Sequence, residues 1–128
     1  MADDAPGKHL QVRLRVYCGN EIAMGPGKAD LLDAIAGAGS ISAAARLLGM
    51  SYRRAWLLVD AMNRCWDQPL VETVPGGSAR SGAAVSPLGR QVLGWYRDLQ
   101  RQANGVGESG SWHSLAAVLR EVPVQRHP

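Results

Sequence analysis

The sequence predicts a mainly helical α+β fold: a winged helix-turn-helix with an N-terminal β-hairpin and a long C-terminal dimerisation helix. Residues 10–24 alternate in polarity and contain a turn signal, as a hairpin does. Residues 41–65 divide into two helices at a glycine, and the glycine-rich residues 75–82 lie between two strand-like runs. The chain has 128 residues, of which 46% are hydrophobic, enough to build one core.

The predicted hairpin begins the fold. Apolar and polar residues alternate from Leu10 to Tyr17, which predicts a half-buried strand. Gly19-Asn20 is a two-residue turn signal, and residues 21–24 can return as the second strand. A helix is expected from Lys28 to Ala36, followed by glycines that favour a helix end.

The next 25 residues carry the helix-turn-helix pattern. Two helices joined by a short turn cross steeply, which requires a small residue at their contact and a glycine in the turn. Ala45 lies four residues before Gly49 and meets both requirements. We expect Ser42 to cap the first helix and Ser51 to cap a second helix from Tyr52 to Cys65. An ordinary Ala-rich helical hairpin is the alternative. The apolar residues expected to complete this core are Leu48, Met50, Ala55, Leu58, Val59 and Met62.

The segment after these helices predicts a wing. A strand over 70–74, the glycine-rich loop 75–82 and a return strand over 83–85 would form it, and Arg80 would bring charge to a sugar-phosphate ridge. A disordered linker is the competing interpretation of the loop. Ser86-Pro87 then predicts the start of a helix that runs to about Ala103.

Three divisions of the chain follow from these elements. Residues 1–9 are expected to be a flexible N-terminus, and residues 10–104 a winged helix-turn-helix domain. Residues 105–128 are expected to be a linker and a short C-terminal helix and tail, the linker beginning at Asn104 and the helix covering about 111–121.

The charge distribution indicates an anionic partner. Residues 46–101 hold eight arginines against four acidic residues, and arginine suits forked contacts with phosphate or guanine. Arg53 and Arg54 lie in the first turn of a predicted helix, where each opposes the helix dipole at a cost of roughly 0.3–1 kcal/mol. A solvated basic face is the plain alternative. The candidate residues for contacting double-stranded DNA are Ser42, Arg46, Ser51, Tyr52, Arg53, Arg54, Trp56 and Arg80.

Four runs of this sequence, together with the glycine loop, match a known pattern: residues 14–28, 39–46, 50–56 and 70–72. They resemble the DNA-binding domain of the ModE family of molybdate-responsive transcriptional regulators. A looser similarity to LysR-type DNA-binding domains is limited to the run from Gly39. The ModE resemblance implies a dimer on a palindromic operator, with residues 51–54 opening the reading helix. Where the family's wing commonly carries a lysine, this chain has Ser78-Ala-Arg80-Ser81, so that contact would pass to Arg80.

The resemblance does not extend to the family's molybdate-binding domains. Only about 25 residues follow the long helix, too few for a small barrel with an oxyanion site. The chain therefore looks like a stand-alone DNA-binding form, and molybdate binding is doubtful.

A homodimer is expected on physical grounds as well. One recognition helix reads few base pairs, so specificity favours two helices about 34 Å apart on a two-fold axis. The tail helix offers further contacts through Trp112 and Leu115. The alternative is a protein-interaction module anchored by exposed aromatic residues. The candidate dimer contacts on the long helix are Leu88, Val92, Trp95, Tyr96 and Leu99.

Other functional classes find no support in the sequence. No nucleophile motif, phosphate-binding loop or dinucleotide fingerprint is present, and the three histidines lack ligand spacing, so we expect no enzyme, cofactor or metal. Cys18 and Cys65 lack CxxC spacing and are expected to be buried or half-buried thiols without a disulfide. With no signal peptide or membrane span, a cytoplasmic protein is expected. The resemblance to ModE regulators implies a bacterial one.

Overall fold

A computed structural model describes residues 7–75 and 81–126 of the chain. The fold is mainly helical and contains two antiparallel two-stranded sheets, which agrees with the predicted α+β class. Most of residues 1–9 and the wing tip with Arg80 lie outside the described residues. The elements are β1 (Val16–Cys18), β2 (Glu21–Met24), α1 (Pro26–Ala38), α2 (Ile41–Leu48), α3 (Tyr52–Cys65), β3 (Val71–Pro75), β4 (Ser81–Val85), α4 (Pro87–Asn104), the 3₁₀ helix η2 (Gly105–Glu108) and α5 (Gly110–Val118).

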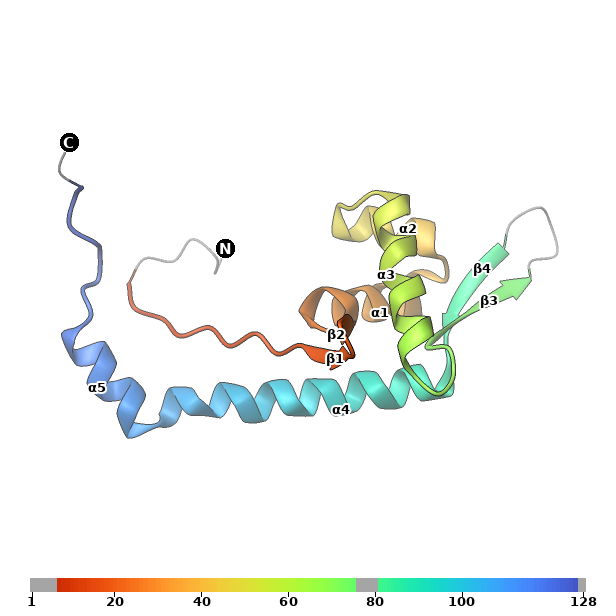
Figure 1. Cartoon of the computed structure of the whole chain (residues 1–128). Coiled ribbons are helices and arrows are strands. Elements are labelled where there is room, and N and C mark those ends of the chain that lie inside the picture. The colour runs from red at the N-terminus through yellow and green to blue at the C-terminus, as the bar shows by residue number, and fades with distance from the viewer. Residues whose placement is uncertain (1–6, 76–80, 127–128) are drawn as a thin grey trace.

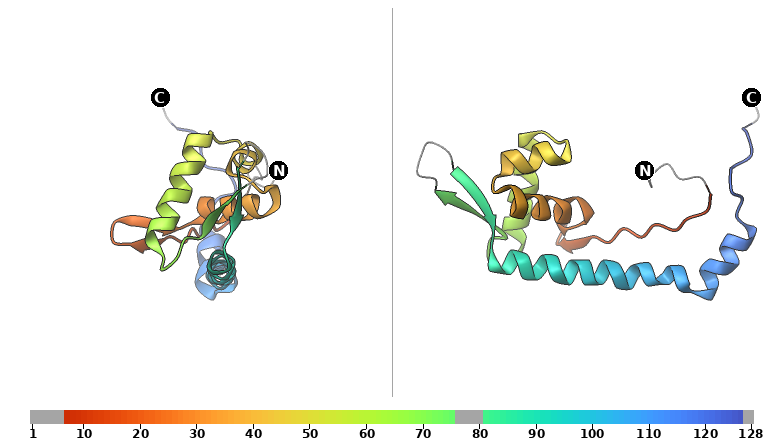
Figure 2. Two further views of the ribbon diagram at one scale, coloured as in Figure 1. Left: turned by 90° about the vertical axis from the view of Figure 1, so that its right-hand side faces the viewer. Right: turned by 180° about the vertical axis from the view of Figure 1, so that it is seen from behind.

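The long helix α4 sets the shape of the molecule. A head formed by α1, α2, α3 and the two sheets stands on one side of α4, and α4 continues past the head to α5 (Figure 1). The view along α4 shows the same one-sided arrangement (Figure 2). The N-terminal segment runs back along α4, and Lys8 Nζ donates a hydrogen bond to the Ala116 carbonyl at 2.7 Å. The end of α3 that bears Tyr52 points away from α4.

The predicted hairpin forms, but its first strand is shorter than predicted. Cys18 pairs with Glu21 across the Gly19-Asn20 turn, where Gly19 has φ 60°. Residues 12–15 keep the predicted alternation of exposure, with Val12 and Leu14 half-buried, but Leu10 is exposed, contrary to the prediction. Residues 8–15 join no ladder in the described part of the chain. The pairing register shifts just after Val16, and β2 gives way to α1 at that point, so no partner strand continues alongside.

Helix caps decide where α1 and α2 begin. Pro26 occupies the first turn of α1, so this helix starts two residues before the predicted Lys28. The cap of α2 is Ser40, whose Oγ accepts a hydrogen bond from the Ala43 amide at 3.1 Å. The prediction of Ser42 as the cap is therefore wrong: Ser42 already lies inside the helix.

The helices α2 and α3 meet through small residues, as predicted. Ala45 and Ala55 are buried, and Gly49 ends α2 in the left-handed conformation with φ 67°. Ser51 caps α3, and Val59 and Met62 lie in the core. Met50 and Leu58 pack against that core from partly buried positions. Leu48 differs from the prediction, because 38% of its surface is exposed.

Hydrogen bonds connect the base of the β3–β4 ribbon to α3 and α4. The Asn63 Oδ1 of α3 accepts hydrogen bonds from the Leu70 and Val71 amides at 2.9 and 3.1 Å. Buried Ser86 caps α4 through the Gly89 amide and donates its hydroxyl to the Pro69 carbonyl at 2.7 Å. These bonds fix where the ribbon leaves the head.

The C-terminal part departs from the prediction in two details. Part of the predicted linker after Asn104 forms the helix η2, and α5 ends at Val118, three residues before the expected end. No residue of α5 is buried. None of the described helices is long and apolar enough to cross a membrane.

Candidate nucleic-acid interface

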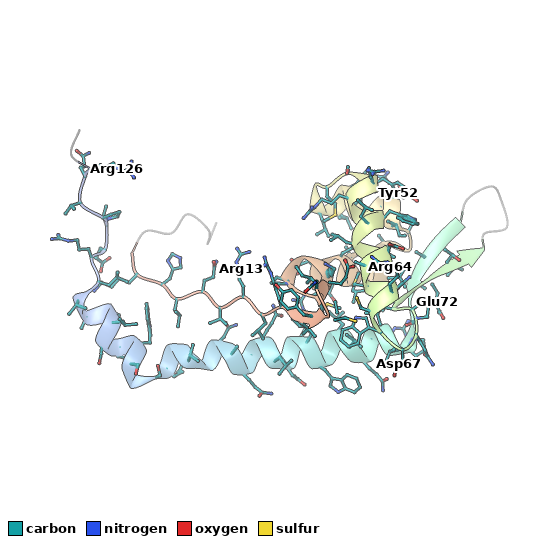
Figure 3. The ribbon with its side chains drawn as sticks, viewed as in Figure 1. Arg13, Tyr52, Arg64, Asp67, Glu72 and Arg126 are labelled. Carbon is teal, nitrogen blue, oxygen red and sulfur yellow. The ribbon has the colours of Figure 1, made fainter. Side chains whose placement is uncertain are left out.

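The free end of α3 presents a polar and aromatic surface. The Ser51 Oγ accepts a hydrogen bond from the Arg54 amide at 3.1 Å, which fixes the first turn. Tyr52, Arg53 and Arg54 are exposed in that turn, and Trp56 follows with 47% of its surface exposed. Figure 3 shows Tyr52 at the end of the helix remote from α4. By helical spacing, Arg53 lies on the side of α3 opposite the core residues Ala55 and Val59, whereas Tyr52 and Trp56 lie beside those core residues.

The arginines at the two ends of α3 differ in whether they form ion pairs. Arg64, near the C-terminal end, donates to Asp60 at 3.0 Å and to Glu21 of β2 at 3.3 Å. A hydrogen bond to Asp60 and the charge of Glu21 raise the pKa of Arg64. Within residues 7–75 and 81–126, neither Arg53 nor Arg54 forms an ion pair. The two guanidinium groups at the start of α3 are therefore available to an external anion.

Hollows lie beside α3, and one of them is also lined by residues of α2 and the ribbon. One, of about 170 Å³, is lined by Ser42, Tyr52, Trp56, Thr73 and Gly82 among others. A larger one, of about 340 Å³, is lined by Tyr52, Arg53, Trp56 and Leu57. The surface thus combines hydroxyl groups, a guanidinium and apolar rings within one region. The sequence did not single out Thr73, because it belongs to no charged or aromatic pattern.

The two predicted contact residues on α2 lie together. Arg46 Nη1 donates to Ser42 Oγ at 3.4 Å, and both side chains are exposed. Seven of the eight predicted contact residues, all except Arg80, therefore fall on α2 or at the start of α3.

The predicted dimer contacts on α4 separate into two groups. Val92 and Tyr96 are buried, with only 4% and 2% of their surfaces exposed. The Tyr96 hydroxyl donates a hydrogen bond to the Leu14 carbonyl at 2.8 Å. These two side chains belong to the core of the protomer, so the prediction that they contact a partner is wrong. Burial raises the pKa of Tyr96. Leu88 is half-buried, and the exposed fractions of Trp95 and Leu99 are 59% and 47%.

Trp95 and Leu99 border an apolar hollow of about 190 Å³ between the hairpin, the end of α3 and α4. Val92 and Tyr96 of α4 also line it, and Val16, Met24 and Trp66 complete the lining. The sequence did not indicate these three residues, because they come from separate elements that only the fold brings to α4.

A polar contact between α1 and α4 was also not predicted. Arg97 Nη2 donates to Asp30 at 3.1 Å and to Asp33 at 2.6 Å. Burial lowers the pKa of Arg97, but the hydrogen bonds to Asp33 and Asp30 outweigh it, and the net direction is upward. Asp30 and Asp33 lie three residues apart on α1 and therefore share one face of that helix. In the described residues, no three His, Cys, Asp or Glu side chains gather as a metal site.

The chain is similar to several known proteins over part of its length. No family model matches the sequence. It is similar to the molybdenum-pterin-binding protein MopB of Rhodobacter capsulatus, with 47% identity over 73 residues. It is also similar to the molybdenum transport protein ModE of Herbaspirillum seropedicae (42% over 72 residues) and to the DNA-binding transcriptional dual regulator ModE of Escherichia coli (37% over 71 residues). Its homologues are ModE and Mop proteins.

These homologues are transcriptional regulators and molybdenum-binding proteins rather than enzymes. The alignments cover 56 or 57% of this chain but only 27% of each relative. The chain therefore spans about a quarter of the length of these relatives.

Proposed function

We propose that the chain is a sequence-specific DNA-binding transcriptional regulator, in which α1–α3 and the β3–β4 ribbon form a winged helix-turn-helix. The observation that carries the proposal is the pair of exposed arginines, Arg53 and Arg54, in the first turn of α3, without an acidic partner among the described residues. Cations at this end of a helix oppose its dipole. Phosphate and guanine reverse that cost, because they accept forked hydrogen bonds from arginine.

The surroundings of the two arginines suit a duplex. A helix that enters the major groove contacts base edges with its first residues and needs neighbouring groups that hold the backbone. Ser42 and Arg46 on α2 supply such groups beside α3. Tyr52 and Trp56 supply apolar surface for sugar or for the methyl group of thymine. The wing residue Arg80 is proposed as an additional phosphate contact.

We further propose that the regulator acts as a homodimer. Two recognition helices are needed for a site of useful length, and half-sites one helical turn apart require about 34 Å between them. Trp95 and Leu99, with Leu88 beside them, form the surface of α4 that we assign to the partner subunit. Residues 10–104 would then be the unit that binds and dimerises.

The proposal is tested by selecting duplexes from a random-sequence pool with the full chain and measuring affinity for the recovered site. Arg53→Ala and Arg54→Ala should each weaken binding about fivefold or more. The variant that loses a phosphate contact should also reduce the slope of log affinity against log salt by about one. Arg126→Ala, at an exposed position on the far side of the molecule, is the matched control (Figure 3). Failure to enrich any sequence, or unchanged affinity in both arginine variants, would refute the proposal.

One observation favours a second candidate, a protein-interaction module. Trp56 and Leu57 are exposed beside the 340 Å³ hollow, and exposed aromatic residues favour protein interfaces. The salt dependence of affinity distinguishes the two candidates. Affinity for DNA falls steeply as the salt concentration rises, because binding releases counterions, whereas the affinity of a largely apolar protein contact changes little. Molybdate added to the DNA titration should leave the affinity of this chain unchanged. A shift would point to the molybdenum binding that its relatives' names describe.

A further inference from the structure

Two thiols meet where the hairpin contacts the C-terminal end of α3. Cys18 is the last residue of β1 and is exposed, whereas Cys65 is the last residue of α3 and is half-buried. The exposure of Cys18 differs from the sequence prediction of two buried or half-buried thiols. Burial raises the pKa of the Cys65 thiol, and the adjacent Cys18 thiol raises it further, which reflects their proximity.

Bonds on both sides of Cys65 hold it against the hairpin. Arg64 donates through both terminal nitrogens to Glu21 Oε1 at 3.3 Å. Trp66 donates its indole N–H to the Ala23 carbonyl at 3.2 Å. Cys65 is thus fixed between two anchors on β2, and the first of these, Glu21, is the cross-strand partner of Cys18.

This anchoring brings Cys65 to the end of the hairpin that carries Cys18. Glu21 faces Cys18 across the two strands, and it accepts from Arg64, the residue before Cys65. Trp66, the residue after Cys65, is bonded to the same strand at Ala23. A disulfide requires Cα atoms about 4.4–6.8 Å apart, and recovery of a peptide that links the two cysteines tests whether they meet that requirement.

We propose that Cys18 and Cys65 are an oxidation site at which a hydroperoxide forms a disulfide between the hairpin and α3. The exposed Cys18 thiolate attacks the peroxide, the O–O bond breaks, and Cys18 becomes a sulfenic acid while an alcohol or water leaves. The Cys65 thiol then attacks the Cys18 sulfur and displaces the oxygen as water. Two thiols lose two electrons and two protons in all, and the peroxide is reduced to an alcohol and water, or to two waters.

The disulfide would restrain the DNA-reading part of the fold without covering it. The closed loop runs from 18 to 65 and contains α1, α2 and α3, so the bond removes conformational freedom from the unfolded chain. Cys65 lies twelve residues after Arg53, which is about 18 Å along the helix. The free end of α3 stays open, and the inference holds whether or not that end binds DNA.

The test treats the reduced full chain with hydrogen peroxide. We expect a monomeric product whose mass is lower by two hydrogens, a peptide that links Cys18 to Cys65, and reversal by dithiothreitol. The midpoint of thermal unfolding should rise by about 10 °C on oxidation. Cys18→Ser and Cys65→Ser should each abolish both the linked peptide and the rise.

A double variant with alanine at positions 18 and 65 provides a second reference for the unfolding midpoint, because alanine tolerates burial better than serine. This double variant should not respond to peroxide. Two thiols that remain open to alkylation after treatment, or disulfides only between molecules, would overturn the proposal.

Discussion

Ser40 shows how one hydroxyl places a helix. Its Oγ accepts from the Ala43 amide, whereas Ser42, two residues later, lies within α2 and accepts from the Arg46 side chain. Both serines suit a cap by type, so the sequence could not separate them. The left-handed Gly39 decides the matter, because it ends α1 and leaves Ser40 extended at φ −155°. At this scale, residue type predicts the kind of contact and the neighbouring backbone selects its position.

Replacing Ser40 with Ala should therefore lower the free energy of unfolding by about 1 kcal/mol, because an orphan amide at the start of α2 loses its acceptor. Ser42→Ala is the matched control and should change it by less than about 0.5 kcal/mol. Urea unfolding followed by circular dichroism measures both. If the larger loss occurred in Ser42→Ala, Ser42 would be the cap after all.

Tyr96 allows a second test of a single hydroxyl group. Its hydroxyl donates the hydrogen bond that connects α4 to the carbonyl of Leu14. Tyr96→Phe keeps the buried ring and removes only that donor. We expect a loss of about 1 kcal/mol in unfolding free energy and faster amide exchange around residues 12–16. Exchange that accelerates equally throughout α4 would instead indicate general destabilisation.

Among the elements, α3 could be predicted from the sequence and the N-terminal strand only in part. The capping serine, the first-turn arginines and the inward positions Ala55, Val59 and Met62 are all local in sequence, and α3 has the predicted bounds. The strand from Leu10 needed a partner along its length, and alternation in one chain segment contains no information about that partner. Its burial pattern could be predicted for residues 12–16 but not at Leu10, and its hydrogen bonding could not be predicted.

The same limit applies to the candidate surfaces. The residues at the start of α3 come from one sequence motif and stay together in the structure. The apolar residues of α4 were also periodic in the sequence. Such a period predicts which face of the helix is buried, but not whether the same chain or a second chain covers that face. Val92 and Tyr96 turn out to pack on the head of the same protomer. Only Trp95 and Leu99 extend well beyond it.

The junction of α4 with the ribbon depends on a glycine. A Cβ at Gly89 would clash with the Leu70 carbonyl and approach Val85 Cγ1 to 2.7 Å, and the backbone there has little room to move. Gly89→Ala should cost about 1–3 kcal/mol of unfolding free energy through overpacking. Gly94→Ala lies in the same helix with nothing within 4 Å, and it should gain up to about 1 kcal/mol. Equal effects from the two substitutions in thermal unfolding would contradict this account.

Across the whole molecule, apolar surface is distributed unevenly. The head has its own core, whereas α5 contributes no buried residue and exposes Leu115 and Val118 at 62% and 83%. α4 carries this apolar end away from the head (Figure 1). Exposed apolar side chains therefore occur both beside the head, at Trp95 and Leu99, and at the far end of the arm. This distribution favours association of two chains along α4.

Association along α4 should fail when its outer face is charged. We expect Trp95→Glu and Leu99→Glu to shift the full chain from dimer to monomer at about 10 μM in sedimentation equilibrium, because each would bury an unpaired carboxylate in the interface. Arg90→Ala is the control: Arg90 is exposed on α4 and lies about 140° around the helix from Trp95. Affinity for a palindromic site should fall at least tenfold in the two glutamate variants, because the half-sites then bind separately. Single half-sites should be bound as by the unaltered chain, since the start of α3 is untouched. Glutamate variants that remain dimeric would place the two-fold contact elsewhere, and the exposed face of α5 would be the next surface to charge.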